Sequence, residues 1–157
     1  MNLILEGPDG AGKTYLAEQL SQLLDMGVRH FSVPSEDLIG KQFSFYRDIG
    51  IDLYNTILDR SWYSDMVYGP IFRGEAEIRH DLMLELERDY TGTFVIYCTG
   101  DPELMWQAAL EHGENYVQTF DQYKEICQRY DDIMYNLYHS IPIHVRRATW
   151  LIQPNES

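Results

Sequence analysis

The chain has 157 residues, and its 25 acidic residues outnumber its 12 basic residues, which gives a formal net charge of −13. This length suits a single domain over residues 1–157, because two domains would each be near the lower limit for an independent core. The charge argues against a nucleic-acid polymer as a partner and against docking on an anionic membrane, and no run approaches the roughly 20 apolar residues of a membrane span.

Short apolar segments alternate with amphipathic ones in the first half of the chain. An apolar run precedes a glycine-rich loop, and leucines then recur at helical spacing. Two further short runs end at Pro34 and Asp59. We therefore expect strands over residues 2–5, 30–33 and 52–58 and a helix over residues 14–24.

The second half of the chain continues this alternation. The run TFVIYCT is rich in β-branched and aromatic residues, which favour strands, and Asp101 followed by Pro102 is typical of a helix start. We expect helices over residues 75–89, 102–110 and 118–138, a strand over residues 93–99 and a last strand within residues 141–150. Strands and helices in this order predict a doubly wound α/β fold, with a parallel sheet of about five strands covered on both faces.

A glycine-rich loop follows the first expected strand. Residues 7–14 read GPDGAGKT and match the phosphate-loop pattern G-x4-G-K-[ST] in full. Glycines let successive backbone N–H groups point at phosphate oxygens, and the next helix adds its positive N-terminal end. Lys13 would reach the β- and γ-phosphates of ATP, and the Thr14 hydroxyl would ligate Mg²⁺. The predicted ATP phosphate-binding residues are Gly7, Asp9, Gly10, Ala11, Gly12, Lys13 and Thr14.

An acid and an arginine follow the third expected strand. The segment DRSWYSDMVYGPIFRG covers residues 59–74, and ligands of open α/β sheets bind in the crevice at such strand ends. Asp59 could orient Mg²⁺ there or accept a proton, and Arg60 could hold a phosphate in a bidentate fork. The alternative is a helix cap followed by a surface arginine.

Together, the two segments resemble the thymidylate kinase and deoxynucleoside kinase branch of the P-loop kinases. The thymidylate kinase group carries a similar DGAGKT loop and an Asp-Arg-aromatic segment followed by a serine and a tyrosine, here Ser64 and Tyr68. DRSWYSD equally resembles the Glu-Arg-Ser segment of deoxynucleoside kinases, and VYGPIFRG resembles small phage-type kinases. The resemblance implies a three-layer P-loop fold that uses ATP with Mg²⁺. It also implies that Arg60 contacts the acceptor's α-phosphate or the transferred group, that Asp59 is the Mg²⁺-orienting or base carboxylate, and that Asp9 assists.

Two positions depart from the family pattern. Thymidylate kinases usually read Arg-Glu-Pro after the second strand and deoxynucleoside kinases read Glu-Pro, whereas this chain reads SVP over residues 32–34. The expected lid, at about residues 111–117, carries no arginine, although these kinases usually have arginines there. A transition-state arginine would then come from Arg73 or Arg47.

Other candidates for the acceptor site lie around these segments. An aromatic cluster with Arg47 falls between the second and third expected strands, where related kinases bind the acceptor base, although such a cluster is also typical of a core. Gly69-Pro70 reads as a turn that would direct Arg73 to the crevice, and Arg146-Arg147 could face ATP or solvent. The predicted substrate-binding residues are Phe43, Tyr46, Arg47, Arg60, Ser64, Tyr68 and Arg73. The predicted catalytic residues are Asp9, Lys13, Asp59, Arg60 and Arg73, with Thr14 and Asp59 as metal ligands.

We therefore expect transfer of the γ-phosphoryl group of ATP to a deoxynucleoside monophosphate, with Mg²⁺ as cofactor. The first alternative is a deoxynucleoside kinase that phosphorylates a nucleoside, with Asp59 as base. A polynucleotide 5′-kinase, disfavoured by the charge, and an ATP-binding regulator without transfer activity are the others. Because only two cysteines are present and the N-terminus lacks a signal peptide's basic region, we expect the cytoplasm, of the host if the protein is phage-encoded. The apolar stripes of the expected helices permit a homodimer.

Overall fold

The computed structural model describes residues 1–32, 34–114, 116–137 and 139–145. Across these residues the chain forms five strands, namely β1 (Asn2–Glu6), β2 (Gly27–His30), β3 (Thr56–Asp59), β4 (Thr93–Cys98) and β5 (Ser140–Ile143). They build one sheet in the order β2-β3-β1-β4-β5, and every neighbouring pair is parallel. The parallel sheet that the sequence predicts is confirmed.

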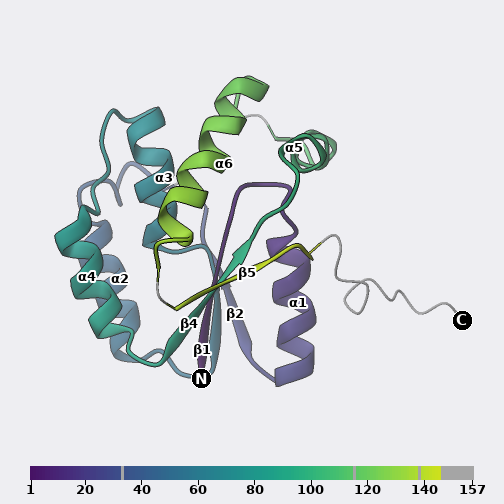
Figure 1. The fold of residues 1–157 in the computed structure, drawn as a ribbon. Coiled ribbons are helices and arrows are strands. Elements are labelled where there is room, and N and C mark those ends of the chain that lie inside the picture. The colour runs from purple at the N-terminus through teal and green to yellow at the C-terminus, as the bar shows by residue number, and fades with distance from the viewer. Residues whose placement is uncertain (33, 115, 138, 146–157) are drawn as a thin grey trace, which may run out of the picture.

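Helices flank this sheet on both sides. Within the described ranges there are six, namely α1 (Lys13–Leu24), α2 (Gln42–Ile51), α3 (Trp62–Phe72), α4 (His80–Asp89), α5 (Pro102–Glu111) and α6 (Phe120–Met134). Figure 1 shows α2, α3 and α4 on one side of the sheet and α1 on the other. The three-layer α/β class is therefore as predicted. None of the helices in this part of the chain has the length and apolar character that crossing a membrane requires.

The strand register decides where the chemistry-bearing residues meet. Leu5 of β1 pairs with Asp59 of β3 and with Ile96 of β4, and His30 of β2 also pairs with Asp59. The central strands are apolar because helices cover both of their faces, and Leu5 is completely buried. Since the carboxyl ends of parallel strands meet at one edge, His30, Asp59 and the loop after β1 come together there.

The second and third strands differ from their predicted positions. β2 ends at His30, where the prediction for residues 30–33 begins, because its pairing with β3 stops at Asp59. Residue 33 lies outside the described residues. β3 starts at Thr56 rather than at residue 52, because α2 runs to Ile51 and a turn through Asn55, at a φ of 48°, joins the two elements.

The sequence patterns do not predict α2 or α3. The aromatic segment of residues 43–47 lies within α2, and Gly69-Pro70 lies inside α3 instead of forming a turn. Gly-Pro tends to end a helix, but α3 continues through this pair because the helix is packed into the protein, with Val67 and Gly69 both buried. Gly69 also lets the returning chain pass, since a Cβ there would lie 2.7 Å from the Glu75 carbonyl oxygen.

Other helix ends shift by a few residues. α4 begins at His80 instead of residue 75, and α6 spans Phe120–Met134 instead of residues 118–138, because the Thr119 side chain caps its first turn. Asp101 caps α5 as predicted, with its side chain accepting from two backbone N–H groups. The last strand is confirmed over Ser140–Ile143, and residues 146–150 of its predicted range lie outside the described residues.

Candidate active site

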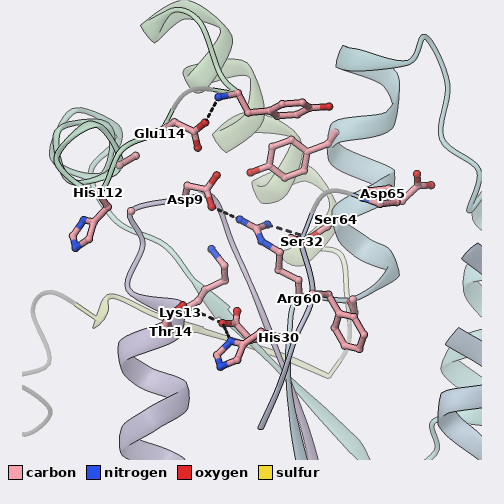
Figure 2. Close-up of a pocket in the computed structure, with 18 of the residues that line it drawn as sticks. Asp9, Lys13, Thr14, His30, Ser32, Arg60, Ser64, Asp65, His112 and Glu114 are labelled. Carbon is pink, nitrogen blue, oxygen red and sulfur yellow. Dashed lines mark hydrogen bonds and ion pairs between the residues drawn. The ribbon is translucent and has the colours of Figure 1, made fainter. Parts of the chain in front are cut away.

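A cleft of about 1110 Å³ opens at the carboxyl edge of the sheet. Its walls come from the loop after β1, the ends of β2 and β3, one face each of α2 and α3, and the segment after α5. Figure 2 shows Lys13, Arg60 and Asp9 converging in its centre, with His112 and Asp65 at opposite ends. The cleft therefore joins the two segments that the sequence analysis identifies.

The phosphate loop forms one wall of the cleft. Gly10 has a φ of 82°, and a Cβ there would lie 2.1 Å from the Met105 carbonyl oxygen, so glycine lets the loop pack against α5. The buried Lys13 ammonium donates a hydrogen bond to the Pro8 carbonyl at 2.8 Å. Burial, and next the positive charge of Arg60, lower the pKa of Lys13. Of the predicted phosphate-binding residues, Asp9, Gly10, Gly12, Lys13 and Thr14 line the cleft, whereas Gly7 and Ala11 do not.

The start of α1 and the end of β3 bring two oxygen donors together. The Thr14 hydroxyl donates to Asp59 Oδ2 at 3.1 Å, and His30 Nδ1 lies 2.7 Å from the same oxygen. A hydroxyl and a carboxylate are hard ligands, which suit Mg²⁺ when substrate phosphates and water complete its shell. The residues predicted to hold the metal therefore fit it. His30, which the sequence analysis does not assign, fixes one Asp59 oxygen from the neighbouring strand.

Arg60 is the basic group at the centre of the site. Its backbone adopts a φ of 78°, and its N–H donates to the Leu5 carbonyl at 2.9 Å, which turns the side chain away from the sheet. The guanidinium pairs with the Asp9 carboxylate through Nη2 and donates through Nη1 to Ser64 Oγ and Tyr130 Oη, both at 3.2 Å. The planar guanidinium is therefore held by Asp9 at Nη2 and by two hydroxyls at Nη1.

The surroundings of Arg60 favour its charged form. Burial acts to lower the pKa of Arg60, but Tyr68, Tyr130 and the nearby carboxylates raise it. Its guanidinium carbon also lies 5.5 Å from the centre of the Tyr68 ring, a cation–π contact. Although burial opposes ionisation of Asp9, the positive charges of Arg60 and Lys13 hold the pKa of that carboxyl below its ordinary value.

The segment after α5 reaches over the phosphate loop. In Figure 2, Glu114 lies above Asp9. Its carboxylate accepts from the backbone N–H groups of Tyr116 and Val117, at 2.5 Å and 3.1 Å. Burial, and next its contact with Asp9, raise the pKa of Glu114. His112 Nδ1 lies 2.7 Å from the Ala108 carbonyl at the end of α5. This is the place where the sequence predicts a lid, and its described residues supply histidine and glutamate to the cleft.

A second polar cluster lies at the far end of the cleft. The buried Asp65 carboxylate accepts from Gln42 Nε2 at 3.0 Å, from the Ile78 N–H at 2.8 Å and from the Arg73 guanidinium. Gln42 Nε2 also donates to the Glu77 carboxylate. Both amide hydrogens of Gln42 are therefore committed to carboxylates, which leaves its oxygen as the acceptor on this side of the cleft.

The structure separates the predicted acceptor residues into two sets. On α2, Gln42 and Tyr46 line the cleft one helical turn apart, whereas Phe43 and Arg47 lie outside it. The Arg47 side chain is 56% exposed, and its Nε lies 3.4 Å from Asp89. Because the segment is a helix, Phe43 and Arg47 lie on another face than Gln42 and Tyr46, and their contact with an acceptor stays a prediction. Of the residues predicted to be catalytic, substrate-binding or metal-binding, those that line the cleft are Asp9, Lys13, Thr14, Tyr46, Asp59, Arg60, Ser64, Tyr68 and Arg73.

Several polar residues of the cleft are not predicted from the sequence. Ser61 and Asp65 line the cleft on the same helical face as the predicted Ser64 and Tyr68, a spacing that becomes readable only if α3 is recognised as a helix. Gln42 has the same relation to Tyr46 on α2. Glu6 carries no comparable signal, because it directly extends an apolar strand. Arg146 and Arg147 lie outside the described residues.

Comparisons with known proteins place this geometry among solved structures. No model of a protein family matches the chain, and no curated protein matches its sequence. The YorR protein from Bacillus subtilis, in complex with phosphorylated GDP, superposes with a TM-score of 0.80 at 24% identity, over 94% of this chain and 87% of that one. A deoxyadenosine kinase from M. mycoides, with dCMP and dCDP bound, gives a TM-score of 0.61 at 14% identity, over 91% and 89% of the chains.

A polyphosphate kinase 2 from Arthrobacter aurescens TC1 has the same architecture, with a TM-score of 0.68 at 15% identity, over 96% of this chain and 62% of that one. At these identities the likeness concerns the fold. The chain therefore has the same three-layer α/β fold as these structures, and a shared fold does not by itself imply a shared function.

Proposed function

We propose that this protein transfers the γ-phosphoryl group of ATP to a deoxynucleoside monophosphate. One observation carries the proposal: a complete phosphate loop, the Thr14–Asp59 oxygen pair and the Arg60 guanidinium share one cleft. Phosphoryl transfer depends on positioning and charge neutralisation more than on covalent chemistry of the protein, and these groups supply both.

The donor phosphates would bind on the loop side of the cleft. The loop amides and the N-terminus of α1 favour anionic oxygens, and the Lys13 ammonium is held in place by the Pro8 carbonyl. Thr14 and Asp59 would hold Mg²⁺, which neutralises charge on the β- and γ-phosphates when it is bound. His30 keeps Asp59 oriented through the same oxygen that contacts Thr14.

The acceptor would lie between Arg60 and the cluster around Asp65. Its phosphate would replace the Asp9 carboxylate on Arg60 Nη2, with Arg73 as the second basic residue on that side. The base would then reach Gln42 and Asp65, whose polar atoms can bind its edge. Tyr68 and Tyr46 add aromatic surface to the same wall.

The second candidate function is that of a deoxynucleoside kinase, and the ion pairs in the cleft support it as an alternative. Arg60 and Arg73 already pair with Asp9 and Asp65, so a second dianionic phosphate must compete with these carboxylates. A nucleoside would bring no such charge, and a carboxylate such as Asp59 could accept the proton of its 5′-hydroxyl.

A substrate panel separates these proposals. The purified protein is incubated with Mg-ATP and each deoxynucleoside or its monophosphate, and products are resolved by chromatography, with a Lys13→Met preparation as control for contaminating kinases. We expect nucleoside diphosphates that the Lys13→Met protein does not form. Phosphorylation of nucleosides alone would establish the deoxynucleoside kinase, and labelling of an oligonucleotide end would establish a polynucleotide kinase. ATP binding without transfer to any acceptor would refute a kinase and point to a regulator.

A further inference from the structure

Glu6 is a fully buried carboxylate with no assigned role. It ends β1 directly before the phosphate loop, has 0% exposure, and is not among the residues that line the cleft. A buried carboxylate costs free energy unless hydrogen-bond donors surround it. Such a group in the floor of a site must therefore be held by its partners, and these partners indicate what it does.

Two elements far apart in the sequence surround Glu6 with donors. From the start of α3, the backbone N–H groups of Ser61 and Ser64 donate at 2.8 Å and 3.1 Å, and the hydroxyls of both serines donate at 2.8 Å and 2.9 Å. From α6, the Tyr130 hydroxyl donates at 3.1 Å. Every one of these contacts presents a hydrogen to the carboxylate, which is the arrangement that an ionised group needs.

Two of these donors also contact Arg60. Ser64 Oγ and Tyr130 Oη each lie 3.2 Å from Arg60 Nη1. A hydroxyl has one hydrogen, so a hydroxyl that donates to Glu6 must use a lone pair toward Arg60, whose guanidinium can only donate. Glu6 therefore fixes the polarity of both chains of hydrogen bonds, from Arg60 through each hydroxyl to the carboxylate.

We propose that Glu6 is a positioning residue, which holds the Arg60 guanidinium at the mouth of the phosphate loop through the hydroxyls of Ser64 and Tyr130. Asp9 occupies Nη2 on the other side and is partly exposed to an incoming phosphate, whereas Glu6 and Tyr130 on the Nη1 side are completely buried. An acceptor phosphate can thus displace Asp9 while the Arg60 guanidinium keeps its orientation. The catalytic consequence rests on the proposed function, but the anchoring of Arg60 does not.

Electrostatics support this arrangement. Burial raises the pKa of Glu6, whereas Arg60, the two serine hydroxyls and Lys13 act against burial. The negative charge lies near the group that must stay positive, and Glu6 is in turn one of the groups that raise the pKa of Arg60. The two groups therefore stabilise each other's charged form inside the protein.

Glu6→Gln tests the polarity, because the amide keeps the shape but turns one acceptor oxygen into a donor. Tyr130→Phe removes one of the two chains and leaves the carboxylate in place. Tyr97→Phe is the matched control, since Tyr97 is a buried tyrosine whose hydroxyl donates to a carboxylate, Asp131, at 2.6 Å. Tyr97 pairs in register with Glu6 and its ring stacks on that of Tyr130, and phenylalanine keeps the ring, so this variant removes only a neighbouring hydroxyl that takes no part in the two chains.

The first readout does not depend on catalysis. NMR of the Arg side-chain Nε–H and guanidinium signals, assigned with Arg60→Lys, follows the rotation of the Arg60 guanidinium. We expect slow rotation in the wild type and the Tyr97→Phe variant, and faster rotation in Glu6→Gln and Tyr130→Phe. Unchanged Arg60 signals in a folded Glu6→Gln or in Tyr130→Phe would overturn the proposal, whether or not the protein proves to be a kinase. If Glu6→Gln does not fold, Tyr130→Phe decides alone.

The second readout uses the phosphoryl transfer that the substrate panel identifies. If the Arg60 guanidinium is no longer held in place, kcat should fall by about 100-fold in Glu6→Gln, because a misplaced guanidinium stabilises the transition state less well. The KM for ATP should stay unchanged. Combining Glu6→Gln with Tyr130→Phe should lower kcat no further than Glu6→Gln alone, since both act through one group. Additive losses would mean that Glu6 and Tyr130 act independently, and an equal loss in Tyr97→Phe would mean that the effect is a general disturbance of the core; either result would overturn the positioning role.

Discussion

At the scale of single residues, Arg60 connects the parts of the candidate site. It follows the carboxyl end of β3, bonds through its backbone to β1, and contacts side chains of the phosphate loop, α3 and α6. Its left-handed φ of 78° is uncommon for a side chain of this size and persists because these contacts hold it. A residue so constrained is suited to hold one phosphate oxygen in a fixed place.

Replacing Arg60 by alanine should therefore affect transfer far more than ATP binding. We expect turnover to fall by about 1,000-fold, because an arginine that stabilises transferring phosphoryl groups has an effect of this order. The affinity for ATP, measured by calorimetry, should stay nearly unchanged because Lys13 and the loop amides hold the donor. Arg129→Ala is the control, since this exposed arginine on α6 pairs with Glu125 outside the cleft. Turnover close to wild type in Arg60→Ala would refute the assigned role.

At the scale of elements, the phosphate loop depends on its contact with α5. The loop can approach this helix closely because Gly10 has no side chain, and the Tyr123 hydroxyl of α6 donates to the Asp9 carbonyl from the same side. The loop is therefore shaped by two helices from the second half of the chain as well as by its own glycines.

Gly10→Ala and Gly92→Ala separate the cost of a side chain in a left-handed backbone conformation from the cost of its clash with α5. Both glycines have a φ of 82°, but a Cβ at residue 10 meets the Met105 carbonyl at 2.1 Å, whereas a Cβ at residue 92 meets nothing within 4 Å. Gly92→Ala should lower the free energy of unfolding by about 1 kcal/mol, the cost of the backbone conformation alone. Gly10→Ala should cost about 3 kcal/mol or more in urea unfolding and should abolish ATP binding. Equal losses would show that packing against α5 is unimportant.

At the scale of the whole molecule, the acidic excess is compatible with the proposed nucleotide site. The net charge of −13 belongs to the full chain, whereas Lys13, Arg60 and Arg73 are gathered in one cleft. Carboxylates also line that cleft, so Arg60 and Arg73 are paired with Asp9 and Asp65 until an anionic ligand arrives. A small number of buried, oriented cations can bind one nucleotide where a long polyanion would meet net repulsion.

Binding of Mg-ATP should therefore stabilise the whole fold. At a concentration 100 times the dissociation constant, ligand binding adds about 2.7 kcal/mol, which for a chain of this size raises the Tm by roughly 5–10 °C. Removing Mg²⁺ with EDTA, or replacing Thr14 by alanine, should reduce this shift because the oxygen pair at the metal position is lost. A shift that is the same with and without Mg²⁺ would contradict the roles of Thr14 and Asp59.

The sequence alone determines the fold class and the two segments that carry the chemistry. Strand and helix order follows from local hydrophobic periodicity, and the phosphate loop and the Asp59-Arg60 pair are each contiguous. The tertiary structure decides what these segments contact. It places Gln42 and Tyr46 in the cleft and Phe43 and Arg47 outside it, because the helix register decides which residues of α2 share a face.

The remaining parts of the site join positions far apart along the chain. Arg60 and Asp9 are separated by 51 residues, Gln42 and Asp65 by 23, and Tyr130 and Glu6 by 124. No local pattern encodes such pairs, because each forms only when the sheet order and the helix packing bring its partners together. The local sequence therefore indicates a candidate phosphate site, whereas the burial of Glu6 beneath Arg60 is decided by the fold.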